Sequence, residues 1–285
     1  MQTVAIQGVK GAYHELAARL YFKETRGEEI HIMPCIQFKD VIDAANSDPN
    51  VMGIMAIENT IAGSLLQNHE LIRKSGLQIV GEQKIRITHS FAALPEDTLE
   101  TLTEVNSHPI ALMQCLEYLN TLPHIKIVEE EDTALSAQEI AEKRKRGHAA
   151  ICSRYAAELY GLKVLAEGIE TNKRNFTRFL LISNPQQSAD MLKGVEINKS
   201  SIVFTLPHTG GSLSQVLTIL SFYDSNLTKI QSLPILGREW EYLFYVDLTF
   251  KDFVKYKQGL DAVRPLTTDF KILGEYQENT STNVE

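Results

Sequence analysis

The triplet Thr177-Arg178-Phe179 combines a hydroxyl group, a guanidinium group and an aromatic ring directly before the apolar stretch Leu180-Leu181-Ile182. The residues before it, Lys173-Arg174-Asn175-Phe176, add two positive charges and an amide in a protein with a formal net charge of -8. Arginine presents a planar fork of donors that matches a carboxylate. Alone, the triplet is more simply the solvated start of a strand, but three further segments favour a small-anion site.

The first of these segments is Glu58-Asn59-Thr60, which ends the apolar run Val51-Met52-Gly53-Ile54-Met55-Ala56-Ile57. Open α/β sheets bind ligands at the carboxyl ends of their strands. The run therefore predicts a buried strand that delivers three hydrogen-bonding side chains to such an edge, followed by a turn at Gly63-Ser64 and a helix.

The second segment runs from Ser107-His108-Pro109 to Gln114-Cys115. Pro109 suits the first turn of a helix, and Gln114 then lies one turn from Ile110 on the same face. The third is the opening of the chain, where a strand is followed by Gly8, Gly11 and a helix start. Such a turn can offer backbone amides to an anion.

Together these segments resemble, in order and spacing, the motifs of bacterial prephenate dehydratases that carry a C-terminal ACT regulatory domain. The resemblance covers nearly the whole chain. It departs from the family at four positions near the expected substrate, where the family usually has Pro, Ser or Thr, Ser or Thr, and Gln instead of Val9, Ala12, His14 and Ile110.

The resemblance implies a reaction in which prephenate loses CO2 and hydroxide to give phenylpyruvate, without a metal or another cofactor. It implies that Thr177 donates a hydrogen bond to the departing hydroxide and that Asn59 and Gln114 orient the substrate. Gln114 is equally well explained as a residue that ties loops together. The remaining expected substrate contacts are Arg178, Phe179, Thr60, Ser107 and Gly11.

Glu58 is a further candidate catalytic residue, and it, Arg178 and Ser107 each have two interpretations. Glu58 is either a structural acceptor or a proton source with a raised pKa. Arg178 either holds a substrate carboxylate or buttresses the cleft, because strand alternation turns it away from Thr177. Ser107 either contacts a carboxylate or caps the following helix.

Composition narrows the class of protein. Hydrophobic residues make up 44% of 285 residues, enough to build the cores of about two domains. The first residues lack the basic and apolar regions of a secretory signal, so we expect a cytoplasmic protein without a membrane partner. The acidic balance argues against nucleic acid as a partner. Three scattered cysteines and unclustered histidines argue against a disulfide framework and a zinc site.

Strand-like and helix-like patterns alternate to about residue 183, which indicates an α/β architecture. Strands are expected at 3–6, 30–33, 51–57, 78–87, 125–128 and 149–152, and helices at 13–21, 38–46, 65–75, 110–120, 133–144 and 154–160. The resemblance implies a catalytic domain at 1–184 with two lobes, like those of periplasmic binding proteins. One comprises about 1–84 plus 165–184, the other 85–164, and the active site lies between them.

A polar linker at 185–198 precedes a β-α-β-β-α-β pattern at 199–277, which predicts a ferredoxin-like α+β unit, and 278–285 reads as a flexible tail. This unit resembles the ACT domains of the family. The likeness implies a phenylalanine-binding site at a subunit interface, in a homodimer or homotetramer, formed by Gly211, Ser212, Leu213, Asn226 and Leu227. The family continues Glu-Ser-Arg-Pro where this chain has Gln231-Ser232-Leu233-Pro234.

Three functions remain open from the sequence. The leading hypothesis is a phenylalanine-regulated prephenate dehydratase of phenylalanine biosynthesis. The second is an arogenate dehydratase, which releases phenylalanine itself. The third is a non-catalytic sensor of small anions or amino acids, against which the set Asn59, Gln114 and Thr177 argues.

Overall fold

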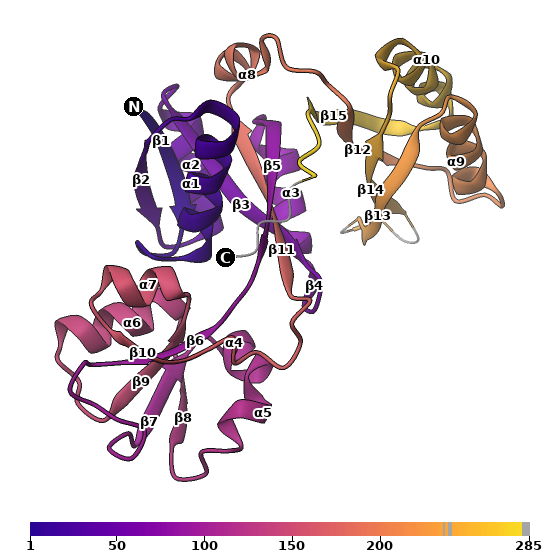
Figure 1. Ribbon diagram of the computed structural model, residues 1–285. Helices are drawn as coiled ribbons and strands as arrows, with labels where there is room; N and C mark the ends of the chain where they lie inside the picture. Colours follow the sequence, from indigo (N-terminus) through magenta and orange to yellow (C-terminus); the bar gives the residue numbers. More distant parts are fainter. Residues whose placement is uncertain (236, 239–240, 281–285) are drawn as a thin grey trace.

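A computed structural model describes residues 1–235, 237–238 and 241–280. Two sheets organise the chain (Figure 1). The larger has ten strands in the order β13-β14-β12-β15-β5-β11-β3-β1-β2, with β4 paired to β3, and the smaller has the order β10-β6-β9-β7-β8. We call residues 1–86 with 176–183 lobe 1, residues 90–167 lobe 2, and residues 199–276 the C-terminal unit.

Lobe 1 is built around β3, whose first seven residues are all buried because the sheet is covered on both faces. On one face Phe22 of α1 packs against Phe179, and on the other Val41 of α2 packs against Ile182. The elements of lobe 1 are β1 Gln2–Gln7, α1 Tyr13–Arg26, β2 Ile30–Cys35, α2 Phe38–Ser47, β3 Val51–Asn59, β4 Gly63–Ser64, α3 Leu66–Ser75, β5 Gln78–Arg86 and β11 Phe176–Ser183.

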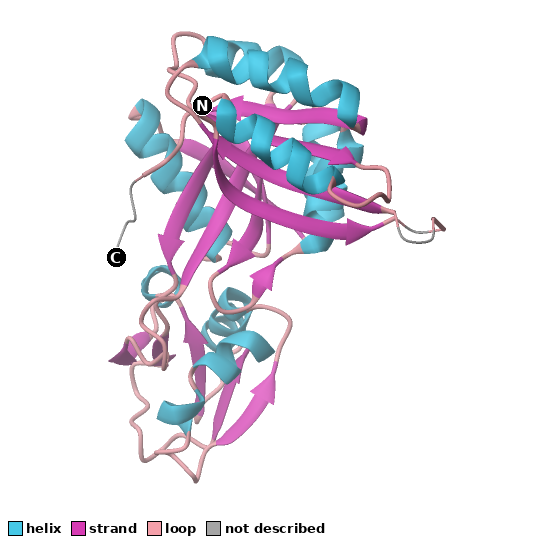
Figure 2. Cartoon of the chain, turned by 90° about the vertical axis from the view of Figure 1, so that its right-hand side faces the viewer, coloured by secondary structure: helices cyan, strands magenta, loops and turns pink. Residues whose placement is uncertain are grey.

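Lobe 2 has its own apolar core and is joined to lobe 1 by two chain segments, residues 87–89 and 168–175 (Figures 1 and 2). The chain leaves lobe 2 later than the boundary expected at residue 164, because Lys163–Glu167 still pairs with β6. The elements are β6 Ser90–Ala93, β7 Glu104–Ser107, α4 Pro109–Gln114, α5 Leu116–Leu119, β8 Lys126–Glu129, α6 Thr133–Glu142, β9 His148–Cys152, α7 Arg154–Leu159 and β10 Lys163–Glu167. The single helix expected at 110–120 is divided at Cys115.

The C-terminal unit has the ferredoxin-like strand order, with α9 and α10 packed against one face (Figure 1). Its elements are β12 Lys199–Thr205, α9 Ser212–Phe222, β13 Asn226–Pro234, β14 Tyr242–Thr249, α10 Phe253–Val263, a 3-10 turn at Arg264–Leu266 and β15 Thr268–Tyr276. Strand β15 also pairs with β5 at Gly274 and Ile79, which joins the strands of the C-terminal unit and of lobe 1 into the one ten-stranded sheet. A side chain at Gly274 would lie 2.1 Å from the Ile79 carbonyl oxygen, so this junction requires glycine.

Two segments expected to be irregular are ordered by packing. The linker contains helix α8, Pro185–Leu192, whose Met191 is buried in the core of lobe 1. In the expected tail, the backbone N–H of Asn279 donates to Glu82 and its side-chain amide donates to Gln83. Residues 281–285 lie outside the described residues.

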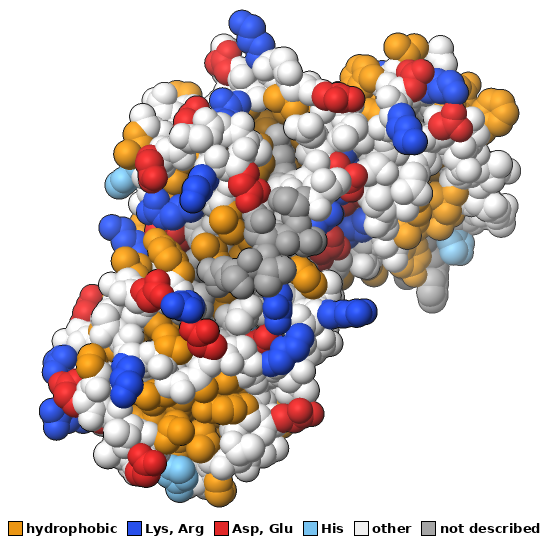
Figure 3. Space-filling model, viewed as in Figure 1, with side chains coloured by type: hydrophobic (Ala, Val, Ile, Leu, Met, Phe, Trp, Pro, Cys, Tyr) orange, Lys and Arg blue, Asp and Glu red, His pale blue; other side chains and the backbone are white. Residues whose placement is uncertain are grey.

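The described chain contains no helix that is both long enough and apolar enough to span a bilayer. On the face drawn in Figure 3, acidic and basic side chains are interspersed. That face therefore lacks the continuous basic stripe with which proteins follow nucleic acid.

Candidate active site

Asn59 and Thr177 lie opposite each other on neighbouring antiparallel strands, where lobe 1 meets the crossings to lobe 2. The pairing of β3 with β11 shifts between Arg178 and Phe179, since Glu58 opposes Arg178 while Ala56 opposes Phe179. The extra residue in β3 makes a bulge, a device that redirects side chains next to active sites. The bulge sets the register in which Asn59 faces Thr177.

Backbone contacts fix the orientation of the Asn59 amide. Its Oδ1 accepts from the N–H groups of Ile61 and Ala62 at 2.9 and 2.8 Å, so its Nδ2 must point the other way. This Nδ2 donates to Thr177 Oγ1 at 2.9 Å and to Asn175 Oδ1 at 2.7 Å. Because Thr177 accepts a hydrogen bond here, its own hydroxyl proton is left to donate elsewhere.

The assignment of donors and acceptors can be followed from Asn59 into lobe 2. Asn175 Oδ1 is already an acceptor, so its Nδ2 donates, and it does so to Gln114 Oε1 at 2.9 Å. The Gln114 amide nitrogen is therefore left as a donor. The three residues expected from the sequence, Asn59, Gln114 and Thr177, are thus joined into one network, with Asn175 as the link.

His89, on the first crossing, is a member of the network that the motif analysis missed. Its Nε2 lies 2.9 Å from Gln114 Oε1, and its Nδ1 lies 3.1 Å from the hydroxyl of Tyr13 in lobe 1. Burial lowers the pKa of His89, so the ring is neutral, with its proton on Nε2 facing the Gln114 acceptor. The available signal was a polar group, Thr88-His89-Ser90, directly before the apolar run Phe91-Ala92-Ala93-Leu94.

A second residue missed by sequence reasoning is Glu170, on the return crossing. It is 1% exposed, and its Oε2 accepts from the His89 backbone N–H at 2.9 Å. Its Oε1 has no hydrogen-bond partner among the described atoms and lies 3.6 Å from Nη2 of Arg86. Glu170 thus ties one crossing to the other beside Gln114.

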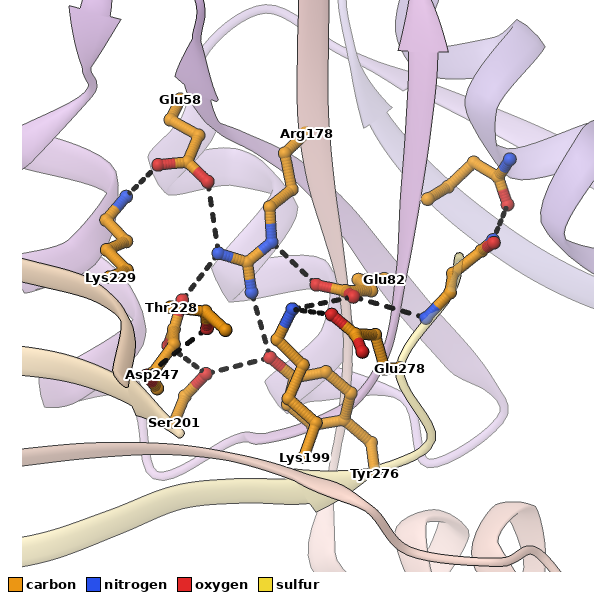
Figure 4. Close-up of polar contacts among 12 residues, drawn as sticks. Glu58, Glu82, Arg178, Lys199, Ser201, Thr228, Lys229, Asp247, Tyr276 and Glu278 are labelled. Atoms are coloured by element: carbon orange, nitrogen blue, oxygen red, sulfur yellow. Dashed lines mark hydrogen bonds and ion pairs between the residues drawn. The ribbon is translucent and has the colours of Figure 1, made fainter. Parts of the chain in front are cut away.

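Arg178 points into the boundary between lobe 1 and the C-terminal unit (Figure 4). Its Nε donates to Glu82 at 2.6 Å, Nη1 to Glu58 at 3.1 Å and to Asp247, and Nη2 to the Tyr276 hydroxyl at 3.0 Å. All three nitrogens have acceptors, and only 7% of the side chain is exposed. The buttress interpretation therefore fits this placement, and the expected substrate carboxylate contact does not.

Glu58 belongs to the same buried cluster. Its two oxygens accept from Arg178 and from Lys229 Nζ, the latter at 2.6 Å. Burial alone would raise the pKa of Glu58, but the two cations outweigh burial and the pKa is lowered. Glu58 is therefore ionised, and the expectation that it supplies a proton is corrected to that of a structural acceptor.

Three expected substrate contacts are buried or already bonded. Phe179 is 1% exposed and packs edge-on against the His14 ring. The Ser107 hydroxyl is fully buried and donates to the Ile151 carbonyl at 2.6 Å, and His108 is the cap of α4 in its place. The Thr60 hydroxyl donates to the Arg174 carbonyl and accepts from the Phe176 N–H.

Gly11 lies at a contact between the lobes. Its N–H donates to the buried Glu15 carboxylate at 2.8 Å, and its carbonyl accepts from Ser153 of lobe 2 at 3.3 Å. A side chain at Gly11 would meet Ala156 at 3.1 Å. The expected anion contact is thus replaced by close packing between lobes, for which the positive φ of 90° also favours glycine.

The residues expected to bind phenylalanine fall at the two ends of α9. Gly211 is its N-cap, Ser212 bonds to Thr209, and Leu213 lines a shallow groove along the helix. Asn226 begins edge strand β13 beyond the other end, followed by the half-buried Leu227.

The donors that this network leaves over are uncharged: the hydroxyl of Thr177 and the amide of Gln114. No three His, Cys, Asp or Glu side chains among the described residues are grouped as metal ligands. The arrangement can hold an anionic substrate and donate a hydrogen bond to a departing oxygen.

Comparison with known sequences agrees with this chemistry. A family model described as prephenate dehydratase matches residues 4–187. Arogenate dehydratase 1 of Petunia hybrida is 36% identical over 292 residues, which cover 96% of this chain and 66% of the plant protein. The bifunctional chorismate mutase/prephenate dehydratase of Escherichia coli strain K12 is 30% identical, with 96% and 70% covered. The chain spans about two-thirds of the length of these relatives.

Two solved structures share the fold. One, described as GqqA, a novel type of quorum quenching acylase, has a TM-score of 0.84 and 27% identity, covering 98% of this chain and 99% of that one. The other, a prephenate dehydratase from Arthrobacter aurescens in complex with L-Phe, has a TM-score of 0.83 and 24% identity, covering 99% and 92%. The expected two-lobed α/β fold is confirmed.

Proposed function

Since the chain belongs to the prephenate dehydratase family, we propose that it converts prephenate to phenylpyruvate in the synthesis of phenylalanine. The observation that carries this proposal is the hydrogen bond from Asn59 to Thr177, which leaves the threonine proton for the substrate. In the reaction the bond to the ring carboxylate breaks, its electron pair enters the ring, and the 4-hydroxyl leaves. Aromatisation supplies the driving force, so the protein must chiefly position the substrate and stabilise the departing hydroxide.

The chain supplies these two functions with fixed donors. Thr177 directs its proton at the leaving oxygen, and the Gln114 amide nitrogen donates to a substrate oxygen across the cleft. Both orientations are set by the network before substrate arrives, which is the condition under which such donors lower a barrier most effectively. Acid assistance of this kind contributes about 10²- to 10⁴-fold.

Arogenate is the second candidate substrate. Its ring is the same as that of prephenate, and its side chain carries an ammonium instead of a keto group. The 36% identity to arogenate dehydratase 1 favours this candidate, while the hydrogen bonds of Asn59 and Thr177 concern the ring chemistry common to both substrates.

A comparison of the turnover of the two substrates decides between the two candidates. The full chain is incubated with prephenate and, separately, with arogenate, and phenylpyruvate and phenylalanine are quantified with and without a chelator. A higher kcat/KM for prephenate, unaffected by the chelator, is the expected result. Preference for arogenate replaces the first candidate with the second, and turnover of neither leaves the sensor hypothesis.

We extend the proposal to regulation: the C-terminal unit is an ACT domain that pairs with a second copy and binds phenylalanine. Helix α9, with 11 residues, is about 16 Å long, so within one chain Gly211 and Asn226 are too far apart to share one small ligand. A site containing both segments needs two chains, and edge strand β13 is free to pair. The solved relative in complex with L-Phe supports the ligand.

Calorimetry with L-phenylalanine beside an activity titration tests this extension. We expect binding heat, loss of dehydratase activity, and a dimer or tetramer by light scattering. Because Gln231 and Leu233 replace the charged residues of the family, a dimer that shows neither heat nor inhibition would mean that the unit serves assembly alone.

A further inference from the structure

His89 lies on the first crossing between the lobes, and both its backbone groups and both its ring nitrogens have bonding partners. Its N–H donates to Glu170 at 2.9 Å and its carbonyl accepts from the Ile169 N–H at 3.1 Å, so the backbone is tied to the chain that returns from lobe 2. Its ring lies between Tyr13 of lobe 1 and Gln114 of lobe 2. His89 is 2% exposed, so water does not compete for these contacts.

The amides of the network decide which ring nitrogen of His89 carries the proton. Backbone N–H groups fix the Asn59 amide, Asn59 donates to Asn175, and Asn175 donates to Gln114 Oε1. The atom that lies 2.9 Å from His89 Nε2 is therefore an acceptor, and Nε2 must be protonated to bond to it. In the neutral ring Nδ1 is then an acceptor, and it faces the Tyr13 hydroxyl at 3.1 Å.

Two donors hold the oxygen of the Gln114 amide, namely the ring of His89 and the amide of Asn175. If the Gln114 amide turned over, its NH2 group would face both of these N–H groups, and two hydrogen bonds would be lost. His89 thus doubles the preference for the orientation in which the Gln114 nitrogen remains available as a donor.

The ring of His89 also links the Gln114 amide to the arrangement of the lobes. Tyr13 is the first residue of α1, and its single hydroxyl proton has two acceptors within reach, His89 Nδ1 and the Thr88 carbonyl at 2.7 Å. Gln114 is the last residue of α4, and its carbonyl accepts from the Thr171 N–H of the return crossing at 2.8 Å. The hydrogen bonds of one side chain therefore connect lobe 1 to the end of a helix in lobe 2.

We infer that His89 is a positioning residue, whose Nε2–H bond to Oε1 keeps the Gln114 amide turned so that the Gln114 nitrogen donates to the substrate. The inference rests on the proposed function, in which this nitrogen bonds to a substrate oxygen. His89 acts on turnover through Gln114, so its effect on the rate should vanish when Gln114 is replaced.

A double-mutant cycle tests the action through Gln114. Because one hydrogen bond is lost, we expect His89→Leu to lower kcat/KM of the full chain about tenfold. In a chain that already carries Gln114→Leu, adding His89→Leu should change kcat/KM little further. A histidine needed only for packing would instead lower kcat/KM by the same factor in both backgrounds.

Matched replacements separate the lost hydrogen bond from the lost ring. His89→Gln can place an amide N–H near the position of Nε2 and should recover much of the activity. His89→Asn is one methylene shorter, cannot reach Gln114, and should behave as His89→Leu does. His69→Leu removes a buried histidine outside the network and should leave kcat/KM near the value of the unmodified chain.

Nitrogen-15 NMR of the histidine rings tests the position of the proton without any turnover. The His89 signals are assigned by their loss in His89→Gln. We expect a neutral ring with its proton on Nε2 in the unmodified chain. In Gln114→Leu the acceptor is gone, so part of the His89 population should carry the proton on Nδ1 instead.

The inference is overturned if His89→Leu keeps full activity, or if it lowers kcat/KM equally with and without Gln114. It is also overturned if the unmodified chain carries the proton on Nδ1, because the Gln114 amide must then be turned over. A chain that converts neither prephenate nor arogenate contradicts the proposed function, whereas the NMR result still supports or overturns the orientation of the amide.

Discussion

Asn59 donates its side-chain amide to the Thr177 hydroxyl across 2.9 Å, and two backbone N–H groups prevent that amide from turning over. A hydroxyl that accepts from Asn59 keeps its proton for a partner in the cleft. The direction of one amide in lobe 1 therefore determines which atom of Thr177 the substrate meets.

Removing that proton should affect the chemical step. We expect Thr177→Val to lower kcat by about 10²- to 10⁴-fold with little change in KM, because the hydrogen bond strengthens only as hydroxide leaves. Thr177→Ser retains the hydroxyl and should keep much of the activity. Steady-state kinetics of both variants check this, and a change confined to KM would make Thr177 a binding residue instead.

Replacing the Asn59 hydrogen-bond donor by an acceptor should lower kcat as much as removing the Thr177 hydroxyl. Asn59→Asp has nearly the same shape, but its carboxylate cannot donate to Thr177 and instead accepts the threonine proton. We expect a fall in kcat of about the same size as for Thr177→Val, with the fold retained by circular dichroism. The exposed Asn120→Asp, at the end of helix α5, is a control for adding a carboxylate. Near-normal kcat for Asn59→Asp would contradict the role of amide polarity.

The cluster around Arg178 should stabilise the junction between lobe 1 and the C-terminal unit. Removing one member of a buried ion cluster leaves unpaired charges, so Arg178→Met should lower the free energy of unfolding by about 3–5 kcal/mol. The exposed Arg174 is the matched control, and Arg174→Met should change the free energy of unfolding by less than about 0.5 kcal/mol. Urea unfolding of both variants measures the difference.

The pH dependence of the Arg178→Met defect follows from Asp247. Burial alone would raise the pKa of Asp247, but Arg178, together with the Ser201 hydroxyl and Lys199, outweighs burial and the net pKa is lowered. A lowered carboxyl pKa contributes stability above the unfolded pKa of about 4, and this contribution disappears as pH falls through the folded pKa. The gap between Arg178→Met and the unmodified chain should therefore narrow in acid, and a constant gap would exclude this carboxylate as the cause.

Two buried histidines should make the protein less stable in mild acid. Burial lowers the pKa of His14 and of His69 to about 3, whereas the unfolded value is near 6.5. Below pH 6.5 the two histidines bind protons in the unfolded state but stay neutral in the folded state. The free energy of unfolding therefore falls from pH 6.5 towards pH 3. The slope is about 1.4 kcal/mol per pH unit for each histidine. We expect His14→Gln with His69→Gln to flatten the slope between pH 6.5 and 5, whereas the exposed His31→Gln should not.

Much of the architecture was accessible from the sequence because it depends on local pattern. The continuous apolar run at 51–57 predicted a strand covered on both faces, and the turn residues after it predicted the position of Asn59 at the strand's end. The β-α-β-β-α-β order of the C-terminal unit follows from helical and strand periodicity in the same way. Motif reasoning also named Asn59, Gln114 and Thr177, which the network joins.

Tertiary structure alone decided the partners of each polar side chain. Thr177 and Arg178 are adjacent in sequence, yet strand alternation places them on opposite faces of the sheet. Thr177 bonds to Asn59, whereas Arg178 bonds to Asp247, 69 residues away in the sequence. Glu58 became a structural acceptor because Lys229 from the C-terminal unit reaches it. His89 and Asn175 joined the site because the two crossings lie side by side. A sequence fixes the type and local direction of a side chain, whereas its charge state and role depend on neighbours that only the folded chain brings within bonding distance.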